Sequence, residues 1–169
     1  MENTKLDWTK FTKRIIINKS IDEVYESWTK PSKIQKWFLE KAQFSDGYNT
    51  IRAADDCIKR KDSFVWKWHN WNFEETGSVL EANDKDLVSF TFGAGGKVTV
   101  KLVDKKKVTE LILTQEDIPA DDKSKMNLFV GCSTGWTFWL TNLKAYLEYG
   151  ITLHAKGLKQ EETTNLVNS

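Results

Sequence analysis

The 169-residue sequence contains only two prolines, two cysteines and two histidines, and no apolar run in it exceeds three residues. A membrane-spanning helix needs about 20 mostly apolar residues, so the sequence predicts no insertion into a membrane. Hydrophobic residues make up 40% of the chain and charged residues 29%, which argues against disorder of the whole chain. A single domain of this length buries about 70% of its unfolded surface, so one substantial core is expected.

Positive and negative charges almost balance, with 25 lysines and arginines against 24 aspartates and glutamates. A surface that follows nucleic-acid phosphates needs a clear basic excess, and no block of this sequence has one. The basic run Lys105–Lys107 follows Asp104 and is typical of the tip of a hairpin. The sequence therefore predicts no nucleic-acid partner.

The residues that most often bind metals stand singly, at Cys57, His69, Cys132 and His154. A metal site needs clustered ligands, so we predict no metal and no other cofactor. Both cysteines are interpreted as ordinary buried thiols. Residues 1–14 are polar and lack the apolar segment of a secretion signal. We therefore expect a cytoplasmic location and reduced thiols.

The N-terminal part of the sequence predicts a strand followed by two short helices. The β-branched run Phe11–Ile17 is typical of a strand. Ser20 and Glu23 have the spacing of a capping box, which marks the start of the first helix. Pro31 can open the second helix, over Ser32–Phe38, because the first helical position needs no N–H donor.

From about residue 39 to residue 116 the hydrophobic pattern has a period of two, which indicates strands. Short turn-forming segments separate these strands and make neighbouring strands antiparallel. The connection 46–61 has no clear pattern. The expected strands are Ser63–His69, Thr76–Ala82, Leu87–Phe92, Lys97–Asp104 and Lys107–Gln115.

A long amphipathic helix is predicted over residues 123–148, with Gly150 as its C-terminal cap. The segment 155–169 has no hydrophobic periodicity, and we expect it to be disordered. The order of elements predicts one α+β domain over residues 10–154.

Several short motifs in this order resemble a known family. They are Trp28–Pro31 followed by Lys36–Phe38, then Trp66–Trp68, Glu75–Glu81 and the helical stretch Gly135–Gly150. Together they resemble the START-like (SRPBCC) domains, in particular the subgroup related to the activator of the heat-shock-protein-90 ATPase. The resemblance implies a helix-grip fold, in which a curved antiparallel sheet of about six strands wraps around the long C-terminal helix. It also implies a hydrophobic cavity between sheet and helix, but no particular reaction.

Aromatic residues are abundant, with eight tryptophans, nine phenylalanines and four tyrosines. Tryptophan combines a large apolar area with one N–H donor, so it suits cavity walls as well as cores. We predict that Trp66, Trp68, Trp136 and Trp139 line the cavity, with plain core packing as the alternative. Trp71 is expected at the cavity mouth or on a contact surface.

The segment Gly131–Gly135 has the spacing of a nucleophile elbow around Ser133. An elbow follows a strand, however, and this segment lies within a helical pattern. A Cys132 nucleophile with His69 or His154 as its base is the alternative enzymatic interpretation. We instead interpret the segment as small residues that let the helix approach the sheet, and predict no catalytic residue.

Two further features bear on function. Glycine disfavours a helix by about 1 kcal/mol relative to alanine, so the glycine-containing stretch 127–135 should open more easily than the rest of the long helix. This stretch could therefore act as a gate that admits a ligand to the cavity. Paired carboxylates, Glu74–Glu75 among them, are interpreted as solvated, whereas Glu81 and Glu110 within strands could act as acid or base if they point inward.

The sequence thus predicts a domain that binds a small hydrophobic or amphipathic molecule without a defined reaction. Two alternatives remain open. One is a co-chaperone-like module that stimulates a chaperone ATPase through its surface, and the other is an enzyme of the cyclase or hydrolase type. A closed apolar cavity favours ligand binding, exposed aromatics favour the module, and a buried carboxylate or histidine beside the cavity favours the enzyme.

Overall fold

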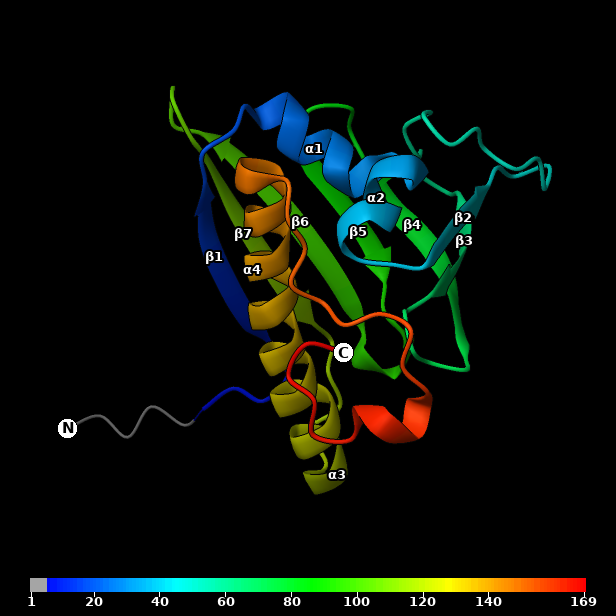
Figure 1. The fold of residues 1–169 in the computed structure, drawn as a ribbon, viewed down its shortest axis with the longest axis vertical. Coiled ribbons are helices and arrows are strands. Elements are labelled where there is room, and N and C mark those ends of the chain that lie inside the picture. The colour runs from blue at the N-terminus through cyan, green and yellow to red at the C-terminus, as the bar shows by residue number, and fades with distance from the viewer. Residues whose placement is uncertain (1–5) are drawn as a thin grey trace.

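A computed structural model describes residues 6–169 as one antiparallel sheet with helices on one face (Figure 1). The sheet has seven strands in the order β1-β7-β6-β5-β4-β3-β2. The strands are β1 Phe11–Ile17, β2 Lys41–Ser45, β3 Ser63–Lys67, β4 Glu74–Ala82, β5 Leu87–Thr91, β6 Lys97–Asp104 and β7 Thr109–Glu116. The sequence predicted about six strands, and β2 comes from the stretch after residue 39 that it left undivided.

The helices follow the predicted order. They are α1 Ile21–Thr29, α2 Pro31–Trp37, α3 Asp122–Ser124, the π-helical turn η2 Lys125–Val130 and α4 Gly131–Tyr149, with short 3-10 turns η1 Gly93–Gly95 and η3 Gln160–Thr163. The predicted capping box is confirmed, because the Glu23 amide donates to Ser20 Oγ and the Ser20 amide donates to Glu23 Oε2. Gly150 ends α4 with a φ of 70°, as a C-terminal glycine cap does.

The core lies between the inner face of the curved sheet and the helices α1, α2 and α4. In β7 the predicted alternation holds, since Leu111, Leu113 and Gln115 are fully buried on the inner face. Aromatic rings fill the space between α1, α2 and the sheet. Trp28, for example, packs edge-on against Trp37 with ring centroids 4.9 Å apart. The combination is the helix-grip arrangement that the sequence predicted.

Residues 155–169 differ from the predicted disorder. This segment returns past α4 (Figure 1) and packs on the turn after β3. Asn70 fixes it twice, because its Nδ2 donates to the Ala155 carbonyl at 2.9 Å and its Oδ1 accepts from the Leu158 amide at 3.0 Å. Such contacts come from polar groups of a distant loop, so hydrophobic periodicity carries no sign of them.

Among residues 6–169, no helix combines the length and the apolar character needed to cross a membrane.

Candidate ligand-binding cavity

A cavity of about 400 Å³ lies between the inner face of the sheet and the N-terminal half of α4. The connection between β3 and β4, the start of β4, the residue after α2 and the residue before η1 supply most of its other walls. Seven of the thirteen lining residues are aromatic. The lining consists of Phe38, Trp68, Trp71, Phe73, Glu75, Phe92, Asn127, Gly131, Cys132, Gly135, Trp136, Trp139 and Ser169.

The aromatic rings form a continuous wall. Trp68 has its ring centroid 6.2 Å from Phe73 and 6.3 Å from Phe92. Phe73 in turn lies 5.7 Å from Trp71, and Phe92 lies 5.4 Å from Trp136. These separations are typical of aromatic pairs that hold one another in place.

The structure places three of the four predicted tryptophans in this lining: Trp68, Trp136 and Trp139. Trp66 lies elsewhere, because it is stacked on Phe64 at 4.0 Å and contacts Phe90 deeper in the core. Trp66 therefore follows the alternative interpretation, core packing, as does Phe64 on the same face of β3. Contact of the other three with a ligand stays a prediction.

Trp136 is fixed at the cavity wall by hydrogen bonds to the sheet. Its Nε1 donates to Gln115 Oε1 at 2.8 Å, and Gln115 Nε2 donates to the Gly95 carbonyl at 2.9 Å. Gln115 is fully buried, and these bonds satisfy both ends of its amide. The chain of bonds links α4 to β7 and to the turn η1.

Glu75 is the polar side chain that the sequence interpretation missed. It was grouped with Glu74 as a solvated pair, but its half-buried carboxylate lines the cavity. Burial raises the pKa of Glu75, and a hydrogen bond from the Gly93 amide opposes that rise. A Cβ on Gly93 would lie 2.9 Å from Glu75 Oε1, so glycine permits this close approach.

A signal for Glu75 was present in the sequence. Strand β4 begins at Glu74, two residues before the predicted start. Glu75 and Gly77 stand four and two residues before Val79, which is buried, so period two puts them on the same inner face. The two glutamates that the sequence suggested as an acid or base, Glu81 and Glu110, form ion pairs instead. Glu110 pairs with Arg14 and Lys105, and Glu81 pairs with Arg60.

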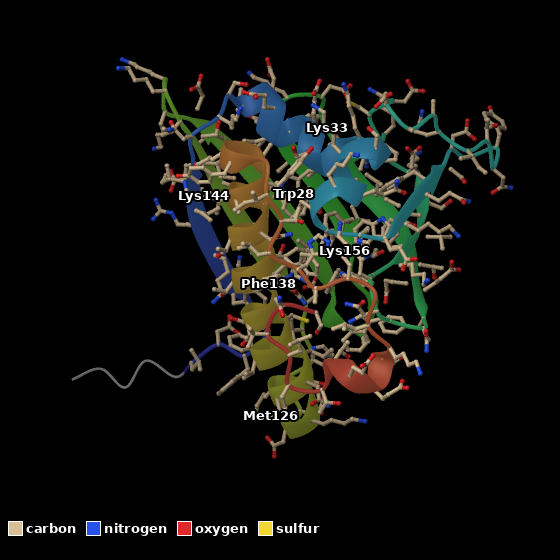
Figure 2. All side chains as sticks on the ribbon, viewed as in Figure 1. Trp28, Lys33, Met126, Phe138, Lys144 and Lys156 are labelled. Atoms are coloured by element: carbon tan, nitrogen blue, oxygen red, sulfur yellow. The ribbon has the colours of Figure 1, made fainter. Side chains whose placement is uncertain are left out.

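The glycines of α4 do not serve the close helix–sheet packing that we favoured. A Cβ on Gly135 would meet no atom within 4 Å, and one on Gly131 would meet only the Met126 carbonyl, at 3.8 Å. Both glycines instead border the cavity. Before them, η2 has no buried residue, and Figure 2 shows Met126 at the end of the helix that projects past the sheet.

The enzymatic alternatives for this segment find little support in the geometry. Gly131–Gly135 is helical and does not follow a strand. Burial raises the pKa of the Cys132 thiol, and its hydrogen-bond partner is Gln115 rather than a histidine. A protonated thiol is a poor nucleophile. Neither His69 nor His154 belongs to the cavity lining.

His69 lines a second, more polar cleft of about 440 Å³ under the C-terminal segment, and His154 packs against His69. Their ring centroids are 4.9 Å apart, and His154 Nδ1 lies 3.2 Å from Asn142 Nδ2. Burial lowers the pKa of His154 to about 4, and Lys156 and His69 add to this effect. Trp71 lines both the cleft and the cavity, so it forms the wall between them.

The family model described as "Activator of Hsp90 ATPase homolog 1-like protein" matches residues 18–148. The chain belongs to this family. The match includes every helix and strand from α1 to β7 and nearly all of α4, so the walls of the cavity that surround Glu75 and Trp136 are family elements. It confirms the family that the sequence motifs resembled. None of the curated proteins matches the sequence.

Several solved structures have a similar fold. The protein SSP2350 from Staphylococcus saprophyticus superposes with a TM-score of 0.69 at 20% identity, over 86% of this chain and 96% of that one. The protein NE0264 from Nitrosomonas europaea gives 0.66 at 16% identity, over 86% and 98%. The Aha1 dimer from Colwellia psychrerythraea has a TM-score of 0.62 at 18% identity, over 83% of this chain and 97% of that one. At these identities the likeness shows the fold alone.

Proposed function

We propose that this protein binds a small hydrophobic or amphipathic molecule in the cavity between the sheet and α4. The observation that carries the proposal is the cavity of about 400 Å³ with its continuous aromatic wall. Ligand pockets usually have this size and an apolar lining with a few polar groups. Trp68, Trp136 and Trp139 are the residues that would contact the ligand, together with Trp71 and Glu75.

A cavity-filling variant tests this proposal. Gly135→Leu places a side chain in the cavity, and the Cβ direction of Gly135 is free of other atoms within 4 Å. Gly47→Leu is the matched control, because its Cβ is equally free and the residue lies in the connection after β2, outside the cavity. The neutral fluorescent probe N-phenyl-1-naphthylamine should bind the unchanged protein and Gly47→Leu equally well.

Gly135→Leu should lower the affinity for the probe by about tenfold or more, because the leucine side chain occupies space that the probe needs. Equal affinity for both variants, or no saturable binding to the unchanged protein, would contradict the proposal. Native mass spectrometry of freshly purified protein then identifies a natural ligand as a mass increment.

A co-chaperone role is the second candidate, and the family description is the observation that favours it. The connection after β2 presents Tyr48, 92% exposed, and Ile51, 62% exposed, as apolar side chains for a partner. If this surface stimulates a chaperone of the Hsp90 type, the chaperone's ATP turnover should rise on addition of the protein. The double variant Tyr48→Ala and Ile51→Ala should abolish that rise, while Gly135→Leu should not.

The cyclase or hydrolase alternative now has one specific observation, the Glu75 carboxylate beside the cavity. A general base needs a substrate proton within hydrogen-bonding reach and a suitable pKa. Mass analysis of any co-purified ligand after incubation distinguishes the two cases, because an enzyme changes the ligand's structure and a binding protein returns it unchanged.

A further inference from the structure

The charge of the cavity lining is one-sided. Among the lining residues that the structure describes, Glu75 is the only acidic side chain, and there is no lysine, arginine or histidine. Neighbouring Glu74 differs, because it points to the outer face and pairs with Lys41 at 3.0 Å. Glu75 has no such ion pair within residues 6–169, and its one hydrogen-bond donor there is the Gly93 amide.

An apolar molecule that filled this cavity would cover Glu75 and strip it of water. A buried carboxylate without a positive partner is costly, because one amide hydrogen bond does not replace its hydration. A ligand with a positive group beside Glu75 removes that cost. The position of the carboxylate therefore discriminates between neutral and cationic ligands of the same shape.

The rings around Glu75 favour the same kind of ligand. Phe73 lies just before β4, two residues from Glu75, and also lines the cavity. Phe92 precedes Gly93, whose amide donates to the Glu75 carboxylate. Aromatic faces attract cations, and quaternary ammonium groups are often bound between several rings. A neutral hydrogen-bond donor could also satisfy Glu75, but it would gain nothing from the ring faces.

We infer that the cavity selects an amphipathic cation: an aryl- or alkylammonium compound whose charged head lies beside Glu75 and whose apolar body lies along Trp68, Trp136 and Trp139. This inference rests on the proposed binding function and names its ligand class. Glu75 is the selecting residue, and the aromatic wall supplies both the apolar contact and the cation–π attraction.

The test compares two molecules of nearly identical shape. Benzyltrimethylammonium carries a permanent positive charge and has no N–H, whereas 2,2-dimethylpropylbenzene has carbon in place of the nitrogen and is neutral. Each competes with N-phenyl-1-naphthylamine for the unchanged protein. The cation should displace the probe at a concentration at least about tenfold lower than the neutral molecule.

Two matched variants assign this preference. Glu75→Gln keeps the size and the hydrogen-bond acceptor of the side chain but removes its charge. It should lower the affinity for the cation by about tenfold and leave the affinity for the neutral molecule unchanged or higher. Glu74→Gln removes a charge from the outer face and should leave both affinities unchanged. Circular dichroism of each variant checks that the fold is retained.

The outcomes separate the two proposals. If the probe and the neutral molecule bind but the cation binds no better, the selection of cations is wrong and ligand binding stands. The same holds if Glu75→Gln lowers both affinities equally, because Glu75 would then only shape the cavity. If the probe itself does not bind, the binding function fails, and the selection of cations fails with it. The comparison on the unchanged protein decides the question even if Glu75→Gln does not fold.

Discussion

The indole N–H of Trp136 donates to the side-chain oxygen of Gln115 at 2.8 Å, and both side chains are almost completely buried. This bond joins α4 to β7, the neighbour of the edge strand β1, at the Trp136 side of the cavity wall. Because Gln115 also donates to the Gly95 carbonyl, one side chain satisfies two buried groups. The stability of the fold and the shape of the cavity therefore depend on the same amide.

Gln115→Leu should destabilise the protein by about 2–4 kcal/mol, because it leaves the Trp136 N–H and the Gly95 carbonyl without their partner. Thr114→Val, on the opposite face of β7, should cost less than about 1 kcal/mol. Denaturant unfolding measures both. A double-mutant cycle with Trp136→Phe should give a coupling energy of at least about 0.5 kcal/mol, and strict additivity would show that the two residues do not interact.

Leu143 is a fully buried residue of α4, and Leu143→Ala should lower the free energy of unfolding by about 2–5 kcal/mol. The next residue, Lys144, is only partly buried, but its Nζ donates to the Ile16 carbonyl at 2.7 Å and pairs with Glu148. It lies on the side of α4 toward β1 (Figure 2). Lys144→Ala should therefore cost about 0.5–1 kcal/mol.

Equal costs for the two variants would mean that α4 is rotated from the orientation described. Thr141→Ala offers a further reference, since Thr141 is exposed and bonds only within its own helix.

His154 should make stability depend on pH. Its pKa is about 4 in the folded protein because burial disfavours the charged imidazole, with Lys156 and His69 acting in the same direction. Well above pH 6.5 the ring is neutral in both the folded and the unfolded state and has no effect on stability. As pH falls from 6.5 toward 4, only the unfolded state gains the proton, so stability is lost, by up to about 3 kcal/mol at lower pH.

His154→Gln removes this titration. Its stability should fall less steeply than that of the unchanged protein between pH 6.5 and 4, when unfolding is measured in denaturant at each pH. Parallel curves over that range would show that His154 is not held neutral by burial.

The segment before Trp136 should open more easily than the rest of the helix. The π-helical turn η2 has no fully buried residue, and Gly131 and Gly135 border the cavity without packing on the sheet. Amides of 131–135 should therefore exchange with deuterium well before those of 140–147. Hydrogen-exchange mass spectrometry or NMR can compare the two segments directly.

The double variant Gly131→Ala and Gly135→Ala should strengthen the helix by up to about 1 kcal/mol per position, because both Cβ positions are free of close contacts. It should also slow the entry of N-phenyl-1-naphthylamine in stopped-flow experiments. Uniform protection of the α4 amides from exchange, together with an unchanged rate of probe entry, would show that 131–135 is not a gate for ligands.

The sequence by itself determined the local elements. The capping box at Ser20, the glycine cap at Gly150 and the alternation of β7 are short-range patterns, and each of them has the predicted structure. The order of these elements, with the short motifs between them, was enough to predict the family and the helix-grip fold. Patterns of this kind are reliable because they depend on neighbours within a few residues.

Only the tertiary structure decided which side chains meet at the cavity. Periodicity puts Trp66 and Trp68 on one face of the predicted strand Ser63–His69. In the structure β3 ends at Lys67, Trp66 is covered by Phe64 and Phe90, and Trp68 borders the cavity. Gly135 looked like a packing residue until its distance from the sheet was known. A period fixes the direction of a side chain, whereas a cavity depends on the spacing between elements far apart in the chain.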